Sequence, residues 1–293
     1  MTRSPDAPAS AAVTTPKTDA REPFAELERA VQADPTSGSA WAGLGRAYQD
    51  AGAHELAQEA FEQAVRFGPG WAAHWYGLGR ARLNTDDLQG ALVAARRAVD
   101  LAPARSGARL LLARALGGLG AVRQGILHLE EALRLDPQWP TPLADLGWAR
   151  LALGEFGAAG EAFEQALHLD PDQTDLWSPL GRCLIEVGRP AGAVHVLETA
   201  VFALPRDSVA WARLGCAYFE TGRHPEAARA FARGFELGEN GLWAWYWAGL
   251  NAAALGDHDT LDKVRCELQA RDPNLAREFE KRVESIVAKA PSC

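Results

Sequence analysis

The sequence has few cysteines, and none of them lies at a spacing typical of a metal site. Its four thiols, Cys183, Cys216, Cys266 and Cys293, include no C-x-x-C pair. In a chain without a secretory signal, this pattern argues against a disulfide framework and favours reduced thiols in a reducing compartment. We therefore expect a cytoplasmic protein with no cofactor and no metal site.

Long apolar runs are also missing. No stretch approaches the roughly 18 apolar residues that span a bilayer, so we expect no membrane partner. Isoleucine and threonine are sparse while alanine, leucine and arginine are abundant, a balance that favours helices over strands. The formal net charge of −8 argues against broad binding to nucleic acid.

Catalytic signatures are absent as well. The sequence contains no G-x-x-x-x-G-K-S/T phosphate loop, no G-x-S-x-G elbow and no dinucleotide-binding fingerprint. The segment that starts at His54 resembles half of a zinc-protease motif, but Gln58 stands where the second histidine is needed. We expect no enzymatic activity.

What the chain does contain is one pattern that recurs every thirty-four residues. Its clearest copy is Trp41-Ala-Gly-Leu44-Gly45-Arg-Ala-Tyr48, followed by Gly52 and Pro69. Prolines and tryptophans recur in register at Pro35, Pro69, Pro103, Pro137, Pro171, Pro205 and Pro273, and at Trp41, Trp75, Trp177, Trp211 and Trp245. Glu239 breaks the proline series, and Arg109 and Leu143 take the tryptophan position in the two middle copies.

Each position in the pattern has a physical reason. Trp41, Leu44, Gly45 and Tyr48 form one stripe of a helix, and the glycine lets a second helix approach closely. A glycine such as Gly52 ends the first helix in a left-handed conformation, and the proline ends the second helix. The second helix carries small residues where it is expected to pack against this glycine, at Ala57, Ala91, Gly125, Ala159, Ala193 and Ala227.

This pattern resembles the tetratricopeptide repeat. The signature residues of that family correspond in the first copy to Trp41, Leu44, Gly45, Tyr48, Ala57, Phe61, Ala64 and Pro69. The resemblance covers seven repeats, 38–71, 72–105, 106–139, 140–173, 174–207, 208–241 and 242–275. It implies an all-α, right-handed superhelical solenoid.

The segments outside the repeats complete the expected domain organisation. Residues 1–21 are rich in Ala, Pro, Ser and Thr and are predicted to form a disordered tail. Residues 22–37 hold an amphipathic helix with Phe24, Leu27 and Val31 on one face, which resembles the second half of a repeat. Residues 276–293 are predicted to form a capping helix and tail, with Phe279, Val283, Ile286 and Val287 facing the last repeat.

The resemblance also implies a concave face, lined by fixed positions of each first helix. These positions predict nine partner-binding residues: Arg46, Arg80, Arg114, Trp148, Arg182, Phe219, Trp243, Tyr246 and Leu250. Arginine suits carboxylates and phosphates, and exposed aromatics are typical interface anchors. The alternative for the arginines is a solvated face paired with Asp50, Asp175 and Glu186, and for the aromatics it is packing on the capping helix.

We expect a non-catalytic scaffold that binds a protein or peptide with acidic and apolar segments. Its groove would be Arg-rich in the N-terminal half and aromatic in the C-terminal half. One alternative is a self-assembling structural scaffold, in which the half-repeat at 22–37 accepts a helix of another copy. A second alternative is an RNA-binding accessory protein, against which the acidic balance weighs.

Overall fold

The computed structural model describes residues 22–239 and 241–289, so the predicted disordered tail lies outside the described residues. Within these ranges the chain is all helical, with sixteen α-helices, one 3₁₀ turn and no strand. The helices are α1 (Glu22–Ala33), α2 (Gly38–Asp50), α3 (His54–Phe67), α4 (Ala72–Asn84), α5 (Leu88–Leu101), α6 (Ser106–Gly118), α7 (Val122–Leu135), α8 (Pro140–Ala152), α9 (Phe156–Leu169), η1 (Thr174–Leu176), α10 (Trp177–Glu186), α11 (Pro190–Ala203), α12 (Ser208–Glu220), α13 (His224–Glu236), α14 (Leu242–Leu255), α15 (His258–Arg271) and α16 (Pro273–Lys289). The predicted all-helical solenoid of tetratricopeptide-type repeats is confirmed.

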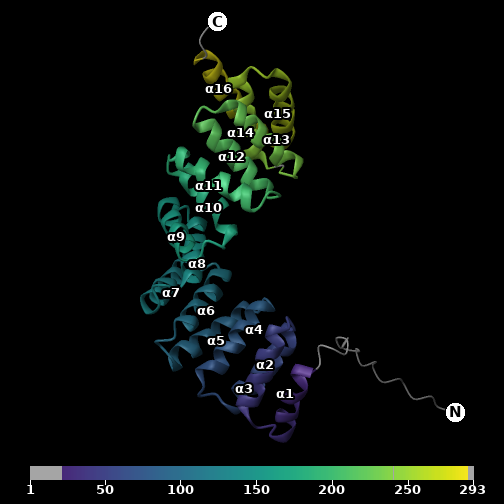
Figure 1. Ribbon diagram of the computed structural model, residues 1–293, viewed down its shortest axis with the longest axis vertical. Helices are drawn as coiled ribbons and strands as arrows, with labels where there is room; N and C mark the ends of the chain where they lie inside the picture. The colour runs from purple at the N-terminus through teal and green to yellow at the C-terminus, as the bar shows by residue number, and fades with distance from the viewer. Residues whose placement is uncertain (1–21, 240, 290–293) are drawn as a thin grey trace, which may run out of the picture. The chain divides into compact units, whose positions relative to one another are not determined.

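The helices form two compact units, which divide after Gly120. Unit 1 contains α1 to α6, and unit 2 contains α7 to α16. Within each unit, helices that follow one another in the chain pack side by side (Figure 1). The division falls between α6 and α7, inside the predicted third repeat, and the seven repeat boundaries stay a prediction. We call α2, α4, α6, α8, α10, α12 and α14 the first helices.

The turns after the first helices need a left-handed residue. Six glycines supply it with φ between 71° and 80°: Gly52, Gly120, Gly154, Gly188, Gly222 and Gly256. The corresponding position after α4 holds Asp86, with φ 60°, the one described residue other than glycine with a positive φ. Aspartate is among the few other residues that tolerate this conformation, so the turn survives the substitution.

The glycines of the first helices make room for large side chains of the second helices. Phe61 of α3 is only 2% exposed and lies between Gly45 of α2 and Gly77 of α4. A Cβ atom added to Gly147 would come within 2.5 Å of the Phe163 ring. The sequence predicts that the two helices of a repeat approach closely at the glycine. In the structure a phenylalanine ring of the second helix occupies the space that a Cβ atom would otherwise fill.

The recurring tryptophans and prolines are joined by hydrogen bonds. The indole Nε1 donates to a backbone carbonyl oxygen in the preceding turn in three cases, Trp41 to Pro35 (2.9 Å), Trp75 to Pro69 (2.7 Å) and Trp211 to Pro205 (3.0 Å). Where Glu239 replaces the proline, Trp245 stacks instead on Phe235 at 4.4 Å, and its buried Nε1 has no partner among the described residues. The break in the proline series thus has a structural consequence.

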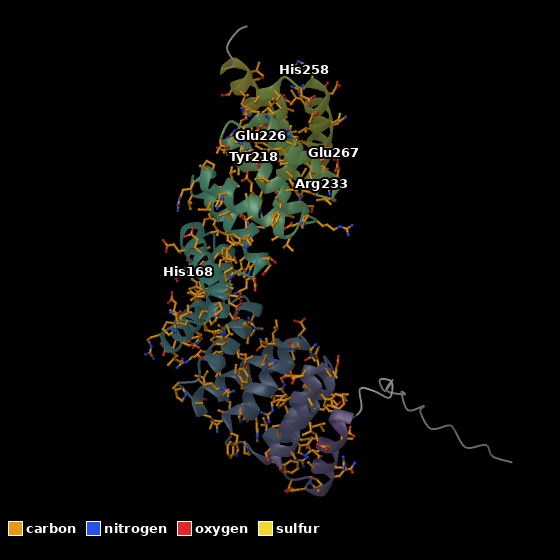
Figure 2. The ribbon with its side chains drawn as sticks, viewed as in Figure 1. His168, Tyr218, Glu226, Arg233, His258 and Glu267 are labelled. Atoms are coloured by element: carbon orange, nitrogen blue, oxygen red, sulfur yellow. The ribbon has the colours of Figure 1, made fainter. Side chains whose placement is uncertain are left out.

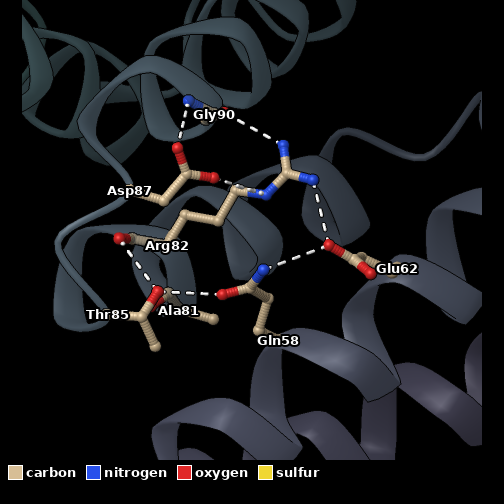
Figure 3. Close-up of polar contacts among 7 residues, drawn as sticks. All are labelled: Gln58, Glu62, Ala81, Arg82, Thr85, Asp87 and Gly90. Carbon is tan, nitrogen blue, oxygen red and sulfur yellow. Dashed lines mark hydrogen bonds and ion pairs between the residues drawn. The ribbon is translucent and has the colours of Figure 1, made fainter.

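A second recurring contact joins a first helix to a helix before it in the chain, in four places. Arg82 of α4, which replaces the family's tyrosine, donates to Glu62 at 3.0 Å and to the Gly90 carbonyl at 3.3 Å, and lies 3.5 Å from Asp87 (Figure 3). The same pair of positions is joined in three other places, Tyr48 to Glu28 (3.4 Å), Arg150 to Glu130 (3.1 Å) and Tyr218, labelled in Figure 2, to Glu198 (2.7 Å). Arginine and tyrosine exchange here because both donate to the same glutamate.

The apolar face of α1 is partly covered by α2. Phe24 stacks on Tyr48 of α2 at 5.2 Å, Leu27 packs beside Gly43, and Val31 is buried. Phe24 and Leu27 are only partly buried, so self-assembly through this face stays a prediction.

The last helix begins earlier than predicted. It starts at Pro273 instead of Ala276, because proline is favoured in the first turn of a helix. Phe279 and Val283 are buried against α14 and α15, as predicted, and Ile286 packs at the margin of the same cluster. The prediction for Val287 is wrong, since its side chain is 56% exposed and points away from this cluster.

Candidate partner-binding surfaces

Three arginines lie at the same position of successive first helices in unit 1. Arg46 of α2, Arg80 of α4 and Arg114 of α6 are all exposed. The described residues show no ion pair for Arg46 or Arg80, so the pairing of Arg46 with Asp50 is not formed. Arg46, Arg80 and Arg114 form an arginine row on the surface of unit 1, in which Arg46 and Arg80 are available to an anionic ligand.

An aromatic ring stands beside this arginine row. Tyr76 of α4 is partly buried, with the Arg80 guanidinium 5.9 Å and the Arg105 guanidinium 4.6 Å from its ring centroid. Such cation–π contacts hold the guanidinium groups in place while leaving their N–H donors free. The sequence analysis missed Tyr76 and Arg105, although Tyr76 occupies one of the positions that the family resemblance assigns to the concave face.

In unit 2, Trp148 remains an exposed aromatic. Its ring meets the edge of Phe163 at 5.4 Å, and 45% of its surface is exposed. Arg182 of α10 lies over the Phe156 ring at 5.5 Å and 3.9 Å from Glu186. An ion pair this long and this exposed contributes little, so Arg182 keeps most of its capacity to bind an anion.

The predicted aromatic group at α14 is only partly available. Phe219 and Tyr246 are half-buried, and both rings meet Trp247, at 5.6 Å and 6.1 Å. Tyr246 also meets Phe279 of α16 at 5.6 Å, which is the alternative of packing on the capping helix. Trp243 remains 38% exposed and is the clearest candidate anchor of this group.

The prediction that Leu250 contacts a partner is wrong. Its side chain is completely buried in the cluster that α14 forms with α15 and α16. Phe279 and Val283 of α16 belong to the same cluster. The equivalent position is at least partly exposed in the first helices from α2 to α10, and it is buried at Cys216 of α12 and Leu250 of α14.

The predicted residues Arg182 and Trp243 meet in one pocket of unit 2. This cavity, of about 390 Å³, lies between α10, α12 and α14 and is lined by Arg182, Ile185, Glu186, Arg213, Cys216, Trp243 and Trp247. Its volume falls within the range of known small-ligand sites. We call it the α10–α14 pocket.

Arg213 is the unusual member of this lining. It is partly buried, and its Nη1 donates to the Ser178 hydroxyl at 2.8 Å, but no ion pair to it occurs among the described residues. Burial lowers the pKa of Arg213, and the neighbouring charge of Arg182 lowers it further. The Asp207 carboxylate acts in the opposite direction and raises this pKa. Arginine stays protonated, so the pocket contains a positive charge that no described carboxylate pairs directly.

The thiols near the pocket are uncharged. Burial raises the pKa of Cys183 to about 11 and raises that of Cys216 well above its usual range. Cys216 therefore contributes a neutral, apolar surface to the pocket wall. Among residues 22–239 and 241–289, no group of His, Cys, Asp and Glu side chains is placed to hold a metal ion.

The sequence analysis missed Arg213 and Ser178. Arg213 lies three residues before Cys216 on α12, so it is about one helical turn from Cys216, which occupies the repeat position of Arg46 and Arg80. Ser178 occupies a position assigned to the concave face, but a serine alone gave no signal. For Trp247 the sequence shows only that α14 carries more aromatic residues than the repeat fold requires.

Comparisons with known proteins agree with this architecture. Models described as tetratricopeptide repeat match residues 24–72, 43–107 and 110–174, and a second model with the same description matches residues 150–214. No curated protein matches the chain in sequence. No described helix is long and apolar enough to cross a membrane.

Solved structures show the same fold at low sequence identity. A chain of the APC/C hetero-tetramer Cut9-Hcn1 is 16% identical with a TM-score of 0.62 over 80% of this chain, which spans 46% of the length of that chain. PilF of Pseudomonas aeruginosa is 17% identical with a TM-score of 0.60, over 72% of this chain and 96% of its own. YrrB, described as a TPR protein with an unusual peptide-binding site, is 23% identical with a TM-score of 0.56, over 64% and 98%.

Proposed function

Because the chain belongs to the tetratricopeptide repeat family, whose members act as protein–protein interaction scaffolds, we propose that it binds an extended segment of a partner protein on its first helices. The arginine row of unit 1 contacts an acidic stretch. The α10–α14 pocket of unit 2 receives a stretch with apolar side chains. Each unit contributes its own surface.

The observation that carries this proposal is the α10–α14 pocket with an exposed indole at its wall. Trp243 is 38% exposed and lines the pocket together with Trp247. Tryptophans at the edge of a cavity are enriched among interface residues that dominate binding energy. The presence of a peptide-binding site in YrrB, a neighbour in fold, is consistent with a peptide ligand.

The arginine row supports the acidic half of the proposal. Arg46 and Arg80 are exposed, and the described part of unit 1 shows no carboxylate paired with either one. The planar guanidinium group donates two parallel hydrogen bonds to a carboxylate. Regularly placed arginines on successive helices therefore favour a ligand that carries several carboxylates along its length.

A peptide array tests both halves of the proposal. The full chain is incubated with acetylated, amidated peptides of random sequence, and the bound set is compared with that of two variants. Arg46→Glu, Arg80→Glu and Arg114→Glu are combined in the first variant, and Trp243→Ala is the second. We expect the first to lose the acidic peptides and the second to lose peptides with large apolar side chains.

Two matched controls separate binding from general effects of charge or exposed surface. Arg66→Glu, Arg96→Glu and Arg97→Glu change the charge equally on the exposed side of α3 and α5. Phe202→Ala removes an aromatic that is 87% exposed on α11. The proposal is wrong if the controls lose the same peptides as the test variants, or if wild-type protein retains no peptide, with circular dichroism confirming intact helix in each.

A further inference from the structure

We propose that the α10–α14 pocket binds the carboxylate of an acidic side chain in the partner segment, with the Arg213 guanidinium as its donor. This inference rests on the proposed function and adds the chemistry that one site recognises. The acidic residue must be flanked by an apolar side chain, because the same pocket has an aromatic wall.

The first argument is the unused hydrogen-bonding capacity of Arg213. A guanidinium has five N–H donors, and the described residues show one of them used, from Nη1 to the Ser178 hydroxyl at 2.8 Å. The hydroxyl is neutral, and the Asp207 carboxylate acts on Arg213 without forming an ion pair among the described residues. A partly buried cation without a directly paired carboxylate is unfavourable, and a carboxylate that enters the pocket lowers that cost.

The second argument is the balance of charge around the cavity. Two cations, Arg182 and Arg213, and one carboxylate, Glu186, line it. Glu186 lies 3.9 Å from Arg182, and its side chain is 45% exposed, so it does not neutralise Arg213. One positive charge remains in excess, which matches a single carboxylate better than a doubly charged phosphate group.

The third argument is the apolar side of the cavity. Ile185, Cys216, Trp243 and Trp247 provide it, and the Cys216 thiol is uncharged. A volume of about 390 Å³ leaves space for an apolar side chain beside the carboxylate. Removal of water by these residues also strengthens the ionic hydrogen bond that Arg213 forms.

The proposed ligand group is an acidic side chain, and the test below distinguishes it from a chain terminus. Trp148 of α8 occupies the corresponding position one repeat before Arg182, is exposed and lies outside the pocket lining. A segment that enters the pocket through a side chain can also contact Trp148.

Nuclear magnetic resonance with defined probes tests the inference directly. The probes are acetylated, amidated pentapeptides, Gly-Leu-Glu-Leu-Gly and Gly-Phe-Glu-Phe-Gly, together with their Gln counterparts. The indole N–H signals of Trp243 and Trp247 report occupancy of the full-length protein. We expect the Glu peptides to shift these signals at millimolar concentration and to bind about ten-fold or more tightly than the Gln peptides, since hydrogen bonds to charged groups are the strong ones.

Variants of Arg213 assign the effect to this side chain. Arg213→Met keeps the volume and removes the charge, and we expect it to abolish the difference between Glu and Gln peptides. Arg213→Lys keeps the charge without the planar fork, and we expect an intermediate preference. Arg229→Met, on the exposed side of α13, is the matched control and should bind as the wild type does.

Three results would overturn the inference. One is the absence of any shift at millimolar peptide, and another is an equal preference for Glu in wild type and Arg213→Met. The third is tight binding only of Gly-Leu-Gln-Leu-Gly with a free terminal carboxylate, which would make the pocket a site for chain ends. If no peptide of the array binds while the Glu pentapeptides do, the scaffold proposal alone is refuted. If the array gives the expected losses but the Glu pentapeptides do not bind, this inference alone is refuted.

Discussion

The packing of Phe61 gives the sharpest test of how the repeats are held together. Its ring is 2% exposed and lies between Gly45 of the same repeat and Gly77 of the next one. A Cβ atom added to Gly77 would overlap three atoms of that ring. Gly77→Ala therefore forces either the ring or α4 to move, in a part of unit 1 that has no spare volume.

The expected magnitude follows from two opposing contributions. Overpacking a well-packed core costs about 1–3 kcal/mol. Alanine forms helices more readily than glycine, which raises the free energy of unfolding by about 1 kcal/mol. We expect Gly77→Ala to lower the free energy of unfolding by up to about 2 kcal/mol. Gly117→Ala in α6 has no atom within 4 Å of the added Cβ, so only the helix-forming contribution remains and stability should rise by up to about 1 kcal/mol.

Urea unfolding followed by circular dichroism measures both variants, and Phe61→Leu completes a double-mutant cycle. The smaller side chain leaves room for the added methyl group, so Gly77→Ala should cost less in the Phe61→Leu background than in the wild type. The reasoning fails if Gly77→Ala stabilises the protein as Gly117→Ala does. It also fails if the cost of Gly77→Ala is the same in both backgrounds.

Two further predictions concern the C-terminal helix and the buried thiol. Val283→Ser should lower the midpoint of thermal unfolding while Val287→Ser leaves it unchanged, because their exposed fractions are 4% and 56%; equal effects would contradict the packing of α16. Burial raises the pKa of Cys183 from 9.0 to about 11, so the unfolded thiol ionises first and stability should fall as the pH rises between these values. Urea midpoints at about pH 8 and pH 10.5 measure the fall, which should be smaller in Cys183→Ala; an identical fall would show that this thiol does not contribute.

The sequence predicts most of the fold because the repeat places each structural requirement at a fixed position. The left-handed turn glycines are an example, since a positive φ is a local requirement that only a few residue types meet. Asp86 shows the limit of this reasoning. The pattern lacks a glycine there, but the turn forms with φ 60°, because the neighbouring helices determine the chain path.

Departures from the family pattern are less easily interpreted from sequence. Arg82 and Arg150 looked like losses of the usual tyrosine. In the structure both donate to the glutamate twenty positions earlier, as Tyr48 and Tyr218 do, and Figure 3 shows this contact for Arg82. The sequence contains a donor and a glutamate twenty positions apart in each case. That they form a pair can be recognised only when the side chains of adjacent repeats are seen in contact.

The candidate site was predictable only where the surroundings of a position stay the same from repeat to repeat. Trp243 and Arg182 satisfy that condition and line the α10–α14 pocket. Leu250 does not, because α16 packs on the last repeat and buries it. Arg213 was not predicted, because its position is not among those that the family resemblance assigns to the concave face. Its side chain lines the pocket because α10, α12 and α14 leave a cavity beside it. Partial burial strengthens the hydrogen bond that Arg213 donates, and under our proposal this makes the pocket prefer a carboxylate to a neutral amide.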